Sequence, residues 1–461
     1  MIGGPSEKEH ESAESWIIVA ILLLGLLLRL PFAAREFRTT SDVETYRRWA
    51  RTIRQQGLET IYAGTDVDYP PLILYLLGGA AKVEAQLPFR EPVAADRALT
   101  ALIKLPAIIA DILTAAVILR ALRGQKPAIR VLACASYTFH PAIWYVSAHW
   151  GQTDSIYTLF LVASMVALER GRLPFAWAAY TLALGTKLQS IAVTPLILVV
   201  TWKRHGLRGL AGGLVASVIT GTILLTPWWF TGHLGDVLRP YITLPDQSPR
   251  LVVSAYNLWY LLRLGRVHLV SSAGQPGVLP FSYQTLGILM FGAFVVLVAG
   301  LMLSRRRTSL FVAAAVLSLG LFMLLTQMHE RYMFPVLAFL LLAAGSQVCP
   351  SLDGVEIRFP GVPGFPGRWF TRKTGLWWAY GVLSLTFLYN LVTIASPVPA
   401  LWTNLVAPQP DSSLVLALRG IAVLVAAANT ATLVGLIAWL AGRVAPLGRS
   451  TGVCPLTTGV Q

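Results

Sequence analysis

The stretch TTSDVETYRRWARTIRQQGLETIYAGTDVDYPP, residues 39–71, is polar and lies between two strongly apolar segments. It carries two pairs of acids, Asp42 with Glu44 and Asp66 with Asp68, on either side of a basic amphipathic segment. Its final Tyr-Pro-Pro must leave the helical conformation, because proline lacks a backbone N–H and restricts the residue before it. Apolar chain on both sides places this polar stretch at a membrane surface.

Composition sets the class of protein. Of the 461 residues, 55% are hydrophobic and 13% are charged. A bilayer core needs about 20 apolar helical residues per crossing, and the chain offers that many times over. We predict an all-α, polytopic membrane protein with about 11–13 transmembrane helices and interfacial helices in the first outer loop. The net charge of +15 then indicates basic cytoplasmic loops and anionic lipid, so no nucleic-acid partner is expected.

The apolar runs predict the order of the spans. They cover residues 16–32, 99–122, 129–146, 155–168, 210–225, 285–303, 310–325, 332–344, 374–394 and 414–440. Residues 173–200 are too long for one upright helix and contain a Gly-Thr-Lys notch at 185–187, which predicts a broken span. Residues 72–81 are too short to cross and are expected in the interface.

Five units follow from these spans. The leader, 1–15, lacks a basic region and a cleavage site, so the first span is expected to be retained. The remaining units are a transmembrane catalytic module at 16–345 with outer loops 33–98 and 226–281, a cytoplasmic Pro/Gly-rich loop at 346–373, C-terminal spans at 374–441 and a cytoplasmic tail at 442–461.

Charge placement predicts the orientation. With the N-terminus inside, the basic turns near residues 120–130, 170–172, 203–208, 305–307, 368–373 and 443–449 all fall in the cytoplasm. The first outer loop also holds many arginines, but acids match them. All the polar clusters then lie on the outer side, whereas polar groups scattered for solubility would fall on both faces.

The acids of the first outer loop are candidates for a general base. Asp42 follows Thr-Ser and is expected near a helix N-terminus, where a carboxylate is favoured. The apolar edge of that helix, Tyr46, Trp49 and Ile53, is expected to lie on the membrane. Asp68 precedes the rigid Tyr-Pro-Pro. A carboxylate held at the membrane boundary can deprotonate a hydroxyl, although a solvated acidic loop is the alternative.

Two lysines lie in or beside predicted spans. Lys104 is seven residues from Asp111, on the same helix face, and is a candidate to bind an anion. The alternative is a structural ion pair with a neighbouring helix. Lys187 sits in the notch of the broken span, where freed backbone can line a cavity, or it is a snorkelling lysine at a helix end.

Two further clusters lie between spans. Trp150, Gln152 and Asp154, in HWGQTD, are suited to orienting sugar hydroxyls, or they form a polar turn with an interfacial tryptophan. His329 and Arg331 are suited to binding phosphate, or they are interfacial charges. No HExxH motif is present, and we predict no metal and no other cofactor.

Nucleotide-binding motifs of the GxxxxGK[ST] and GxGxxG types are absent. Nucleotide sugars are cytoplasmic, so a transferase at the outer face needs a donor already attached to lipid. The sequence thus favours a lipid-linked sugar as donor.

The motifs, taken in order, resemble the GT-C superfamily of glycosyltransferases. The similarity is to dolichyl-phosphate-glucose-dependent N-glycan glucosyltransferases, the GPI mannosyltransferase I type and their prokaryotic relatives. It rests on Asp42 in the first outer loop, DYPP at 68–71, KLP and Asp at 104–111, HWGQTD at 149–154, TKLQ at 186–189, YNLW at 256–259 and HERY at 329–332.

The resemblance implies inverting transfer of a hexose, mannose or glucose, from a polyprenyl-phosphate donor to a lipid-linked or glycan acceptor on the extracytoplasmic face, in a prokaryotic plasma membrane. Asp42 is the implied base, while the departure Glu44 and the second pair leave Asp68 as an alternative. His329 and Arg331 are implied to hold the donor phosphate, assisted by Lys187 or Lys104. The residues Trp150, Gln152, Asp154, Asn257 and Tyr69 are candidates to bind sugar or acceptor.

These carboxylates and cations are expected to meet in one pocket. A secondary transporter is the main alternative class, but it would carry its charges at mid-membrane in two repeated halves. A flippase or a polymer ligase for lipid-linked saccharides would share the handling of a lipid phosphate.

Overall fold

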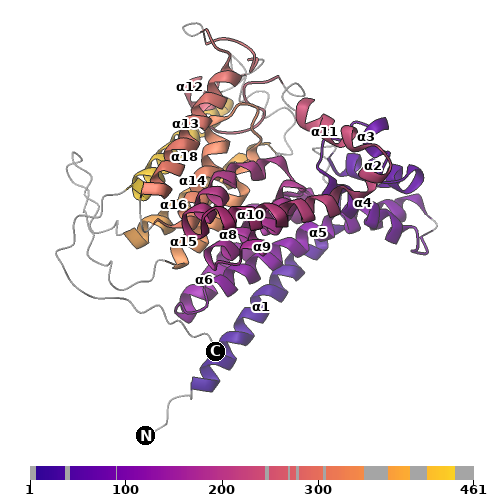
Figure 1. Cartoon of the computed structure of the whole chain (residues 1–461), viewed down its shortest axis with the longest axis horizontal. Coiled ribbons are helices and arrows are strands. Elements are labelled where there is room, and N and C mark those ends of the chain that lie inside the picture. Colours follow the sequence, from indigo (N-terminus) through magenta and orange to yellow (C-terminus); the bar gives the residue numbers. More distant parts are fainter. Residues whose placement is uncertain are drawn as a thin grey trace, which may run out of the picture.

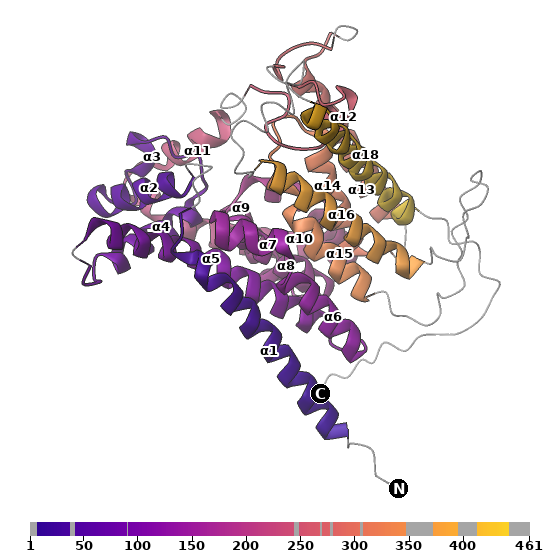
Figure 2. The same cartoon turned by 180° about the vertical axis from the view of Figure 1, so that it is seen from behind.

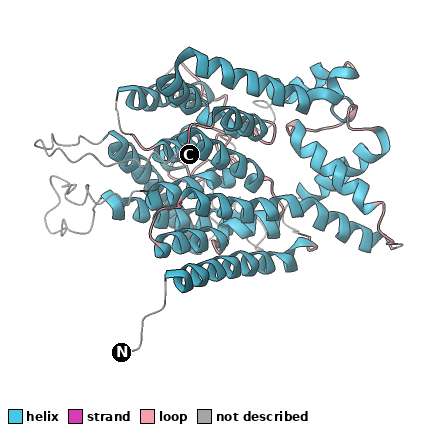
Figure 3. Ribbon diagram, turned by 60° about the horizontal axis from the view of Figure 1, so that its bottom comes forward, coloured by secondary structure: helices cyan, strands magenta, loops and turns pink. Residues whose placement is uncertain are grey.

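The structure, a computed structural model, describes residues 7–36, 42–89, 91–243, 249–267, 270–276, 280–304, 308–346, 372–394 and 413–441. Helices make up most of these ranges, and the only β-type pairing within them is an isolated antiparallel bridge between Arg250 and Ser271 (Figures 1 and 3). Six of the described helices are long and apolar enough to cross a membrane. The prediction of an all-α, polytopic membrane protein is confirmed.

The N-terminal half is a bundle in which α8 packs against α5 and α9, and α1 lies along α5 (Figures 1 and 2). Its helices are α1 (Glu7–Ala33), α5 (Pro92–Ala121), α6 (Pro127–Thr138), α8 (Asp154–Glu169), α9 (Leu173–Leu184) and α10 (Thr194–Phe230). Inside α10, Gly206 has φ 61° and ψ −158°, a conformation suited to glycine, so α10 is two helices joined at a kink. This kink lies in the predicted basic turn at 203–208.

The C-terminal half has its most buried helices at the centre. It comprises α13 (Tyr283–Ser304), α14 (Leu310–Leu324), α15 (Phe334–Ser346), α16 (Arg372–Ile394) and α18 (Ser413–Ala441). α14 and α15 are buried almost all round, which explains why their sequences are apolar on every face. α15 also packs against α8 and so joins the two halves.

The first outer loop folds into α2 (Asp42–Gln56), α3 (Ile61–Gly64) and α4 (Pro71–Glu84). With α11 (Leu234–Thr243), these helices gather at one end of the molecule, opposite the start of α1 (Figures 1 and 2). The predicted membrane-facing edge of α2 is wrong: Tyr46, Trp49 and Ile53 are only 2%, 3% and 5% exposed, and α2 packs on α4 and α5. An amphipathic pattern is the same whether a helix covers lipid or protein.

Ion pairs hold α2 in this place. Four of its arginines each pair with an acid of a different segment: Arg47 with Glu36, Arg48 with Asp66, Arg51 with Asp96 and Arg54 with Glu84. Acids therefore match the arginines of this loop, as the sequence analysis expected.

Two predicted spans are interrupted. The span at 129–146 was expected to be continuous, but α6 ends at Thr138 and a short α7 (Pro141–Trp144) leads into a π-helix, η1 (Tyr145–Trp150). Pro141 explains the break, because it cannot donate to the preceding turn, and the His140 ring accepts the N–H of Ala142 at 3.2 Å instead. The break at 185–187 is confirmed, and a 3₁₀ helix, η2 (Leu188–Val193), follows it.

The basic turns of the N-terminal half lie together at the other end of the bundle. Arg130 pairs with Glu14 near the start of α1 at 2.9 Å, and Arg204 pairs with Glu169 at the end of α8 at 2.8 Å. Arg170 donates to the carbonyl of Arg120 at 2.5 Å. The basic turns of the N-terminal half, which the predicted orientation places in the cytoplasm, thus lie at one end of the bundle.

Some predicted units differ in extent. Residues 7–15 of the predicted leader belong to α1, and the outer loop after α10 begins beyond Phe230 and includes α11 and α12 (Leu258–Leu262). The predicted cytoplasmic loop lies almost entirely, and the tail wholly, outside the described residues.

Candidate active site

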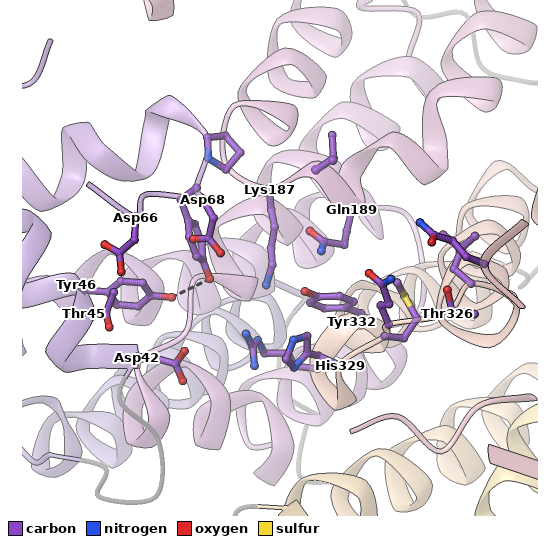
Figure 4. Close-up of a pocket in the computed structure, with 18 of the residues that line it drawn as sticks. Asp42, Thr45, Tyr46, Asp66, Asp68, Lys187, Gln189, Thr326, His329 and Tyr332 are labelled. Carbon is purple, nitrogen blue, oxygen red and sulfur yellow. Dashed lines mark hydrogen bonds between the residues drawn. The ribbon is translucent and has the colours of Figure 1, made fainter. Parts of the chain in front are cut away.

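A cavity of about 500 Å³ opens at the end of the molecule that carries α2 to α4. Its wall comes from five segments far apart in sequence: residues 42–49, 66–70, 187–189, 284–288 and 325–332. Carboxylates lie at one end, Lys187 and His329 lie near the middle, and Gln189 and Thr326 lie beyond them (Figure 4). Asp42, Asp68 and Arg331 line this one cavity, so the expected meeting of carboxylates and cations is found.

Two cations at the middle of the cavity share one buried carboxylate. Asp154, the first residue of α8, is fully buried. Its Oδ1 accepts from Lys187 Nζ at 2.8 Å, and its Oδ2 lies 3.5 Å from Arg331 Nε. The break after α9 is what turns Lys187 toward the cavity, because its backbone is extended there, with φ −158° and ψ 132°. Asp154 was predicted to bind sugar, but it lies behind the cations and does not line the cavity.

Arg331 is held by an aromatic ring and by a carboxylate. Its guanidinium lies 5.1 Å from the centre of a Trp150 ring, and its Nη1 donates to Glu330 Oε1 at 3.2 Å. Burial alone would raise the pKa of Glu330, but the neighbouring His329 ring, with its Nδ1 3.8 Å from Oε2, and the charge of Arg331 outweigh it and hold that pKa at about 2. Glu330 therefore stays charged and keeps Arg331 in place.

Asp42 sits in the first turn of α2, where the helix dipole favours a carboxylate. The Trp150 indole donates to its Oδ2 at 3.0 Å. Trp150 was predicted to bind sugar, but it is 2% exposed and lies behind the wall, between Asp42 and Arg331. One buried side chain thus links the acidic and basic parts of the cavity.

Asp68 and Tyr69 enter the cavity from the loop before α4, whose direction is set by Pro70 and Pro71. Burial raises the pKa of the Asp68 carboxyl, and the nearby charge of Asp66 adds to the effect. Tyr46 donates to Tyr69 at 2.8 Å across the cavity wall (Figure 4). Asp68 is therefore protonated more easily than an ordinary aspartate.

The second acid of this pair is engaged elsewhere. Asp66 accepts from the Trp49 indole at 3.0 Å and from Arg48 at 2.6 Å. The Trp49 hydrogen bond and the charge of Arg48 lower the pKa of Asp66, against a smaller effect of burial. Asp66 and Asp68 therefore differ in role although they are two residues apart: Asp66 anchors the loop to α2, and Asp68 faces the cavity.

Many of the other residues that line the cavity are neutral. Amide and hydroxyl groups come from Gln189, Gln284, Thr326 and Gln327, and apolar side chains come from Leu188, Ile288, Leu325 and Met328. On the outer surface nearby, Ile191 is 51% and Ile288 is 58% exposed. In a membrane, such apolar surface is in contact with lipid chains.

Three predicted site residues lie away from the cavity. Lys104 is fully buried and binds four backbone carbonyls, so it is not placed to reach a phosphate. Asn257 caps α12 by accepting from Tyr260 N at 3.2 Å. Glu44 is on the exposed face of α2 and does not line the cavity.

Gln152 lies beside the cavity without lining it. It is fully buried and its Oε1 lies 3.3 Å from Tyr46 OH, so it supports the wall of the cavity.

The alternative of a structural ion pair with a neighbouring helix is correct for Asp111. It pairs with Arg29 of α1 at 2.9 Å, and both side chains are fully buried.

Several lining residues are not among the predicted site residues. Tyr46 is predicted on the lipid-facing edge of its helix, and Tyr332, whose ring centre lies 5.0 Å from Lys187 Nζ, is predicted at the start of a span. Gln284 and Gln327 do not belong to any of the sequence motifs quoted above. A tyrosine on the apolar face of a polar helix was the one available signal, since its hydroxyl needs a partner when buried.

No group of three or more His, Cys, Asp or Glu with the geometry of a metal site occurs among the described residues. The absence of a metal in the reaction stays a prediction.

Comparisons with known proteins give a weak structural likeness. ArnT from Cupriavidus metallidurans in the apo state is similar over 94% of this chain and 78% of that chain, with 17% identity and a TM-score of 0.47. ArnT bound to undecaprenyl phosphate is similar over 93% and 78%, with 16% identity and a TM-score of 0.46. No family model and no curated protein matches the chain. Likeness at this level says nothing about a shared activity, and the GT-C resemblance continues to rest on the motifs quoted above.

Proposed function

We propose that this protein is an integral membrane glycosyltransferase that transfers a hexose from a polyprenyl-phosphate donor to a hydroxyl of a lipid-linked or glycan acceptor. One observation carries the proposal: carboxylates at one end and cations at the middle line a single cavity of about 500 Å³, among the ends of apolar helices. Such a cavity can hold a phosphate, a sugar and an attacking hydroxyl together.

The cations Lys187 and Arg331, with His329, are the proposed phosphate site. Lys187 and Arg331 are 5% and 7% exposed, so their charges act in a partly dehydrated site where attraction to phosphate is strong. Arg331 Nε faces the buried Asp154 at 3.5 Å and Nη1 faces Glu330, so a phosphate oxygen would be bound by the part of the guanidinium that lines the cavity.

Asp42 is the proposed general base. It takes the proton of the acceptor hydroxyl while the acceptor oxygen forms a bond to C1 of the sugar. The bond between C1 and the phosphate oxygen breaks, its electron pair stays on the leaving polyprenyl phosphate, and C1 is inverted. The indole of Trp150 orients the Asp42 carboxylate, and Asp68 is placed to hold a sugar hydroxyl. Preorganised charges of this kind are each worth about 10²–10³ in rate.

The donor lipid is proposed to leave the cavity past Ile288. Leu188, Ile288 and Leu325 line the cavity, and Ile288 is 58% exposed, so its side chain also belongs to the lipid-facing surface. The isoprenoid chain can then stay in the bilayer while the phosphate reaches Lys187. The basic turns at the opposite end support an extracytoplasmic site, and the proposed membrane is the plasma membrane of a prokaryote.

The test is a transfer assay in proteoliposomes with polyprenyl-phosphate glucose and polyprenyl-phosphate mannose as donors and octyl glycosides as acceptors. Asp42→Asn is expected to lose transfer and to keep binding of polyprenyl phosphate. Glu44→Gln, on the exposed face of the same helix, is the matched control and is expected to match wild type.

Wild-type turnover by Asp42→Asn would rule out Asp42 as the base. Two other outcomes would replace the proposal. Uptake of free hexose without a lipid-linked donor would indicate a transporter. Movement of the intact lipid-linked sugar between leaflets, without transfer, would indicate a flippase.

A further inference from the structure

Lys104 joins the ends of two helices. Its Nζ donates to the carbonyls of Phe32 at 3.3 Å and Arg35 at 2.7 Å, at and just beyond the end of α1. It also donates to the carbonyls of Ala148 at 3.1 Å and His149 at 2.8 Å, at the end of η1. Helix C-termini present carbonyls without intrahelical partners and carry partial negative charge, so a buried ammonium binds there favourably.

The backbone beside Lys104 is adapted to its side chain. Gly151 has φ 89°, and a Cβ on this residue would lie 2.8 Å from Lys104 Cε. Glycine at this position therefore serves two purposes, because it adopts the left-handed conformation and leaves room for the lysine stem. The turn that ends η1 is built around Lys104.

The next residue after the bound carbonyl of His149 is Trp150. Its indole donates to Asp42 at 3.0 Å, and its ring lies 5.1 Å from the Arg331 guanidinium. Phe32 closes the same junction through an edge contact with His149, with ring centres 5.4 Å apart. The position of Trp150 thus depends on the junction that Lys104 makes.

We propose that Lys104 is a positioning residue of the transfer reaction: by tying α1 to η1, it sets Trp150 and, through it, the placement of Asp42 relative to Arg331. It touches neither donor nor acceptor. This inference rests on the proposed function and assigns Lys104 a role different from the phosphate binding that the sequence suggested.

The test is a double-mutant cycle in the transfer assay. Lys104→Met keeps the length of the stem and removes the donors, and Trp150→Phe removes the indole N–H. Misplacement by about 1 Å can cost about 10²-fold in rate, so Lys104→Met is expected to lower kcat about 10–100-fold with little change in the KM for the donor. If Lys104 acts through Trp150, the double variant is no slower than the slower single variant.

Three controls make the result specific. Lys82→Met, at an exposed lysine near the end of α4, is expected to match wild type. Lys104→Arg keeps the charge and the donors and is expected to recover part of the rate. If Lys104→Met does not fold, the cycle is run with Lys104→Arg, whose smaller defect must disappear in the Trp150→Phe background.

Independent, multiplying effects of the two substitutions would overturn the inference. A Lys104→Met variant that raises the donor KM at unchanged kcat would also overturn it and would restore a direct role in phosphate binding. Both outcomes require a wild-type protein that transfers sugar, so they are distinct from failure of the proposed function, in which wild type itself transfers nothing.

Discussion

Replacing Asp154 by asparagine would test whether the carboxylate beneath the cavity stands in for the substrate phosphate. The substitution keeps the shape of the side chain and removes its charge. Asp154 is fully buried, 2.8 Å from Lys187 Nζ and 3.5 Å from Arg331 Nε, so both cations lose their shared counter-charge.

The expected size follows from this geometry. Breaking a buried ion pair by removing one partner costs about 3–5 kcal/mol, because a charge is left buried and unpaired. In wild type, Asp154 repels a phosphate bound to the same cations; for unit charges about 4–6 Å apart at an effective dielectric of 20 this repulsion is about 3–4 kcal/mol, and Asp154→Asn removes it. If only a third to two-thirds of this reaches binding, affinity for polyprenyl phosphate rises about 10–100-fold. The variant should also turn over more slowly, because the same lipid phosphate is the leaving product.

The assay is thermal unfolding in detergent with and without polyprenyl phosphate, together with a direct binding titration. Asp154→Asn is expected to melt lower than wild type without ligand and to gain more from the ligand. Asp96→Asn is the matched control: its ion pair with Arg51 is 37% exposed, so its removal should change stability by no more than about 1 kcal/mol. Weaker or unchanged binding of polyprenyl phosphate by Asp154→Asn would refute the reasoning.

Three other substitutions have defined outcomes. Arg331→Lys keeps the charge but loses the planar fork, and a fall in kcat of about 10²-fold is expected, with donor kinetics as the measurement. Because burial raises the pKa of Asp68, the acidic limb of the pH–rate profile should lie above the usual aspartate range, and Asp68→Asn should move it to lower pH, where protonation of the proposed base Asp42 alone stops transfer. The folded carboxyl holds its proton more tightly than the unfolded one, so its ionisation lowers stability as pH rises through that window, and Asp68→Asn should be the more stable protein above it. Arg29→Met should destabilise by about 3–5 kcal/mol, whereas Arg29→Met with Asp111→Leu should recover most of the loss in a melting experiment; equal melting of the single and double variants would contradict this.

Hydropathy predicted where helices lie but not what covers them. The runs at 310–325 and 332–344 correspond to α14 and α15, which are buried in protein rather than exposed to lipid. The face of α2 that carries Trp49 was misassigned for the same reason, since apolar patterning reports removal from water only. The break at 185–187 was predictable because glycine and a charged residue interrupt an apolar run.

The site was predictable where a residue's chemistry is unusual for its position. Asp42, Lys187 and Arg331 are charged groups next to apolar helices, and all three line the cavity. Lys104 and Asp154 are equally unusual but serve other side chains or backbone. A sequence does not show which backbone carbonyls at helix ends will bind a lysine. It also does not show which carboxylate will line the cavity and which will lie behind it.

The most direct measurement is an experimental structure with bound polyprenyl phosphate. We expect the phosphate oxygens to lie about 3 Å from Lys187 Nζ and from the Arg331 guanidinium, with Asp42 facing the same space and the lipid chain leaving past Ile288. A phosphate bound outside this cavity, or at the end of the bundle that holds Glu14 and Glu169, would contradict it.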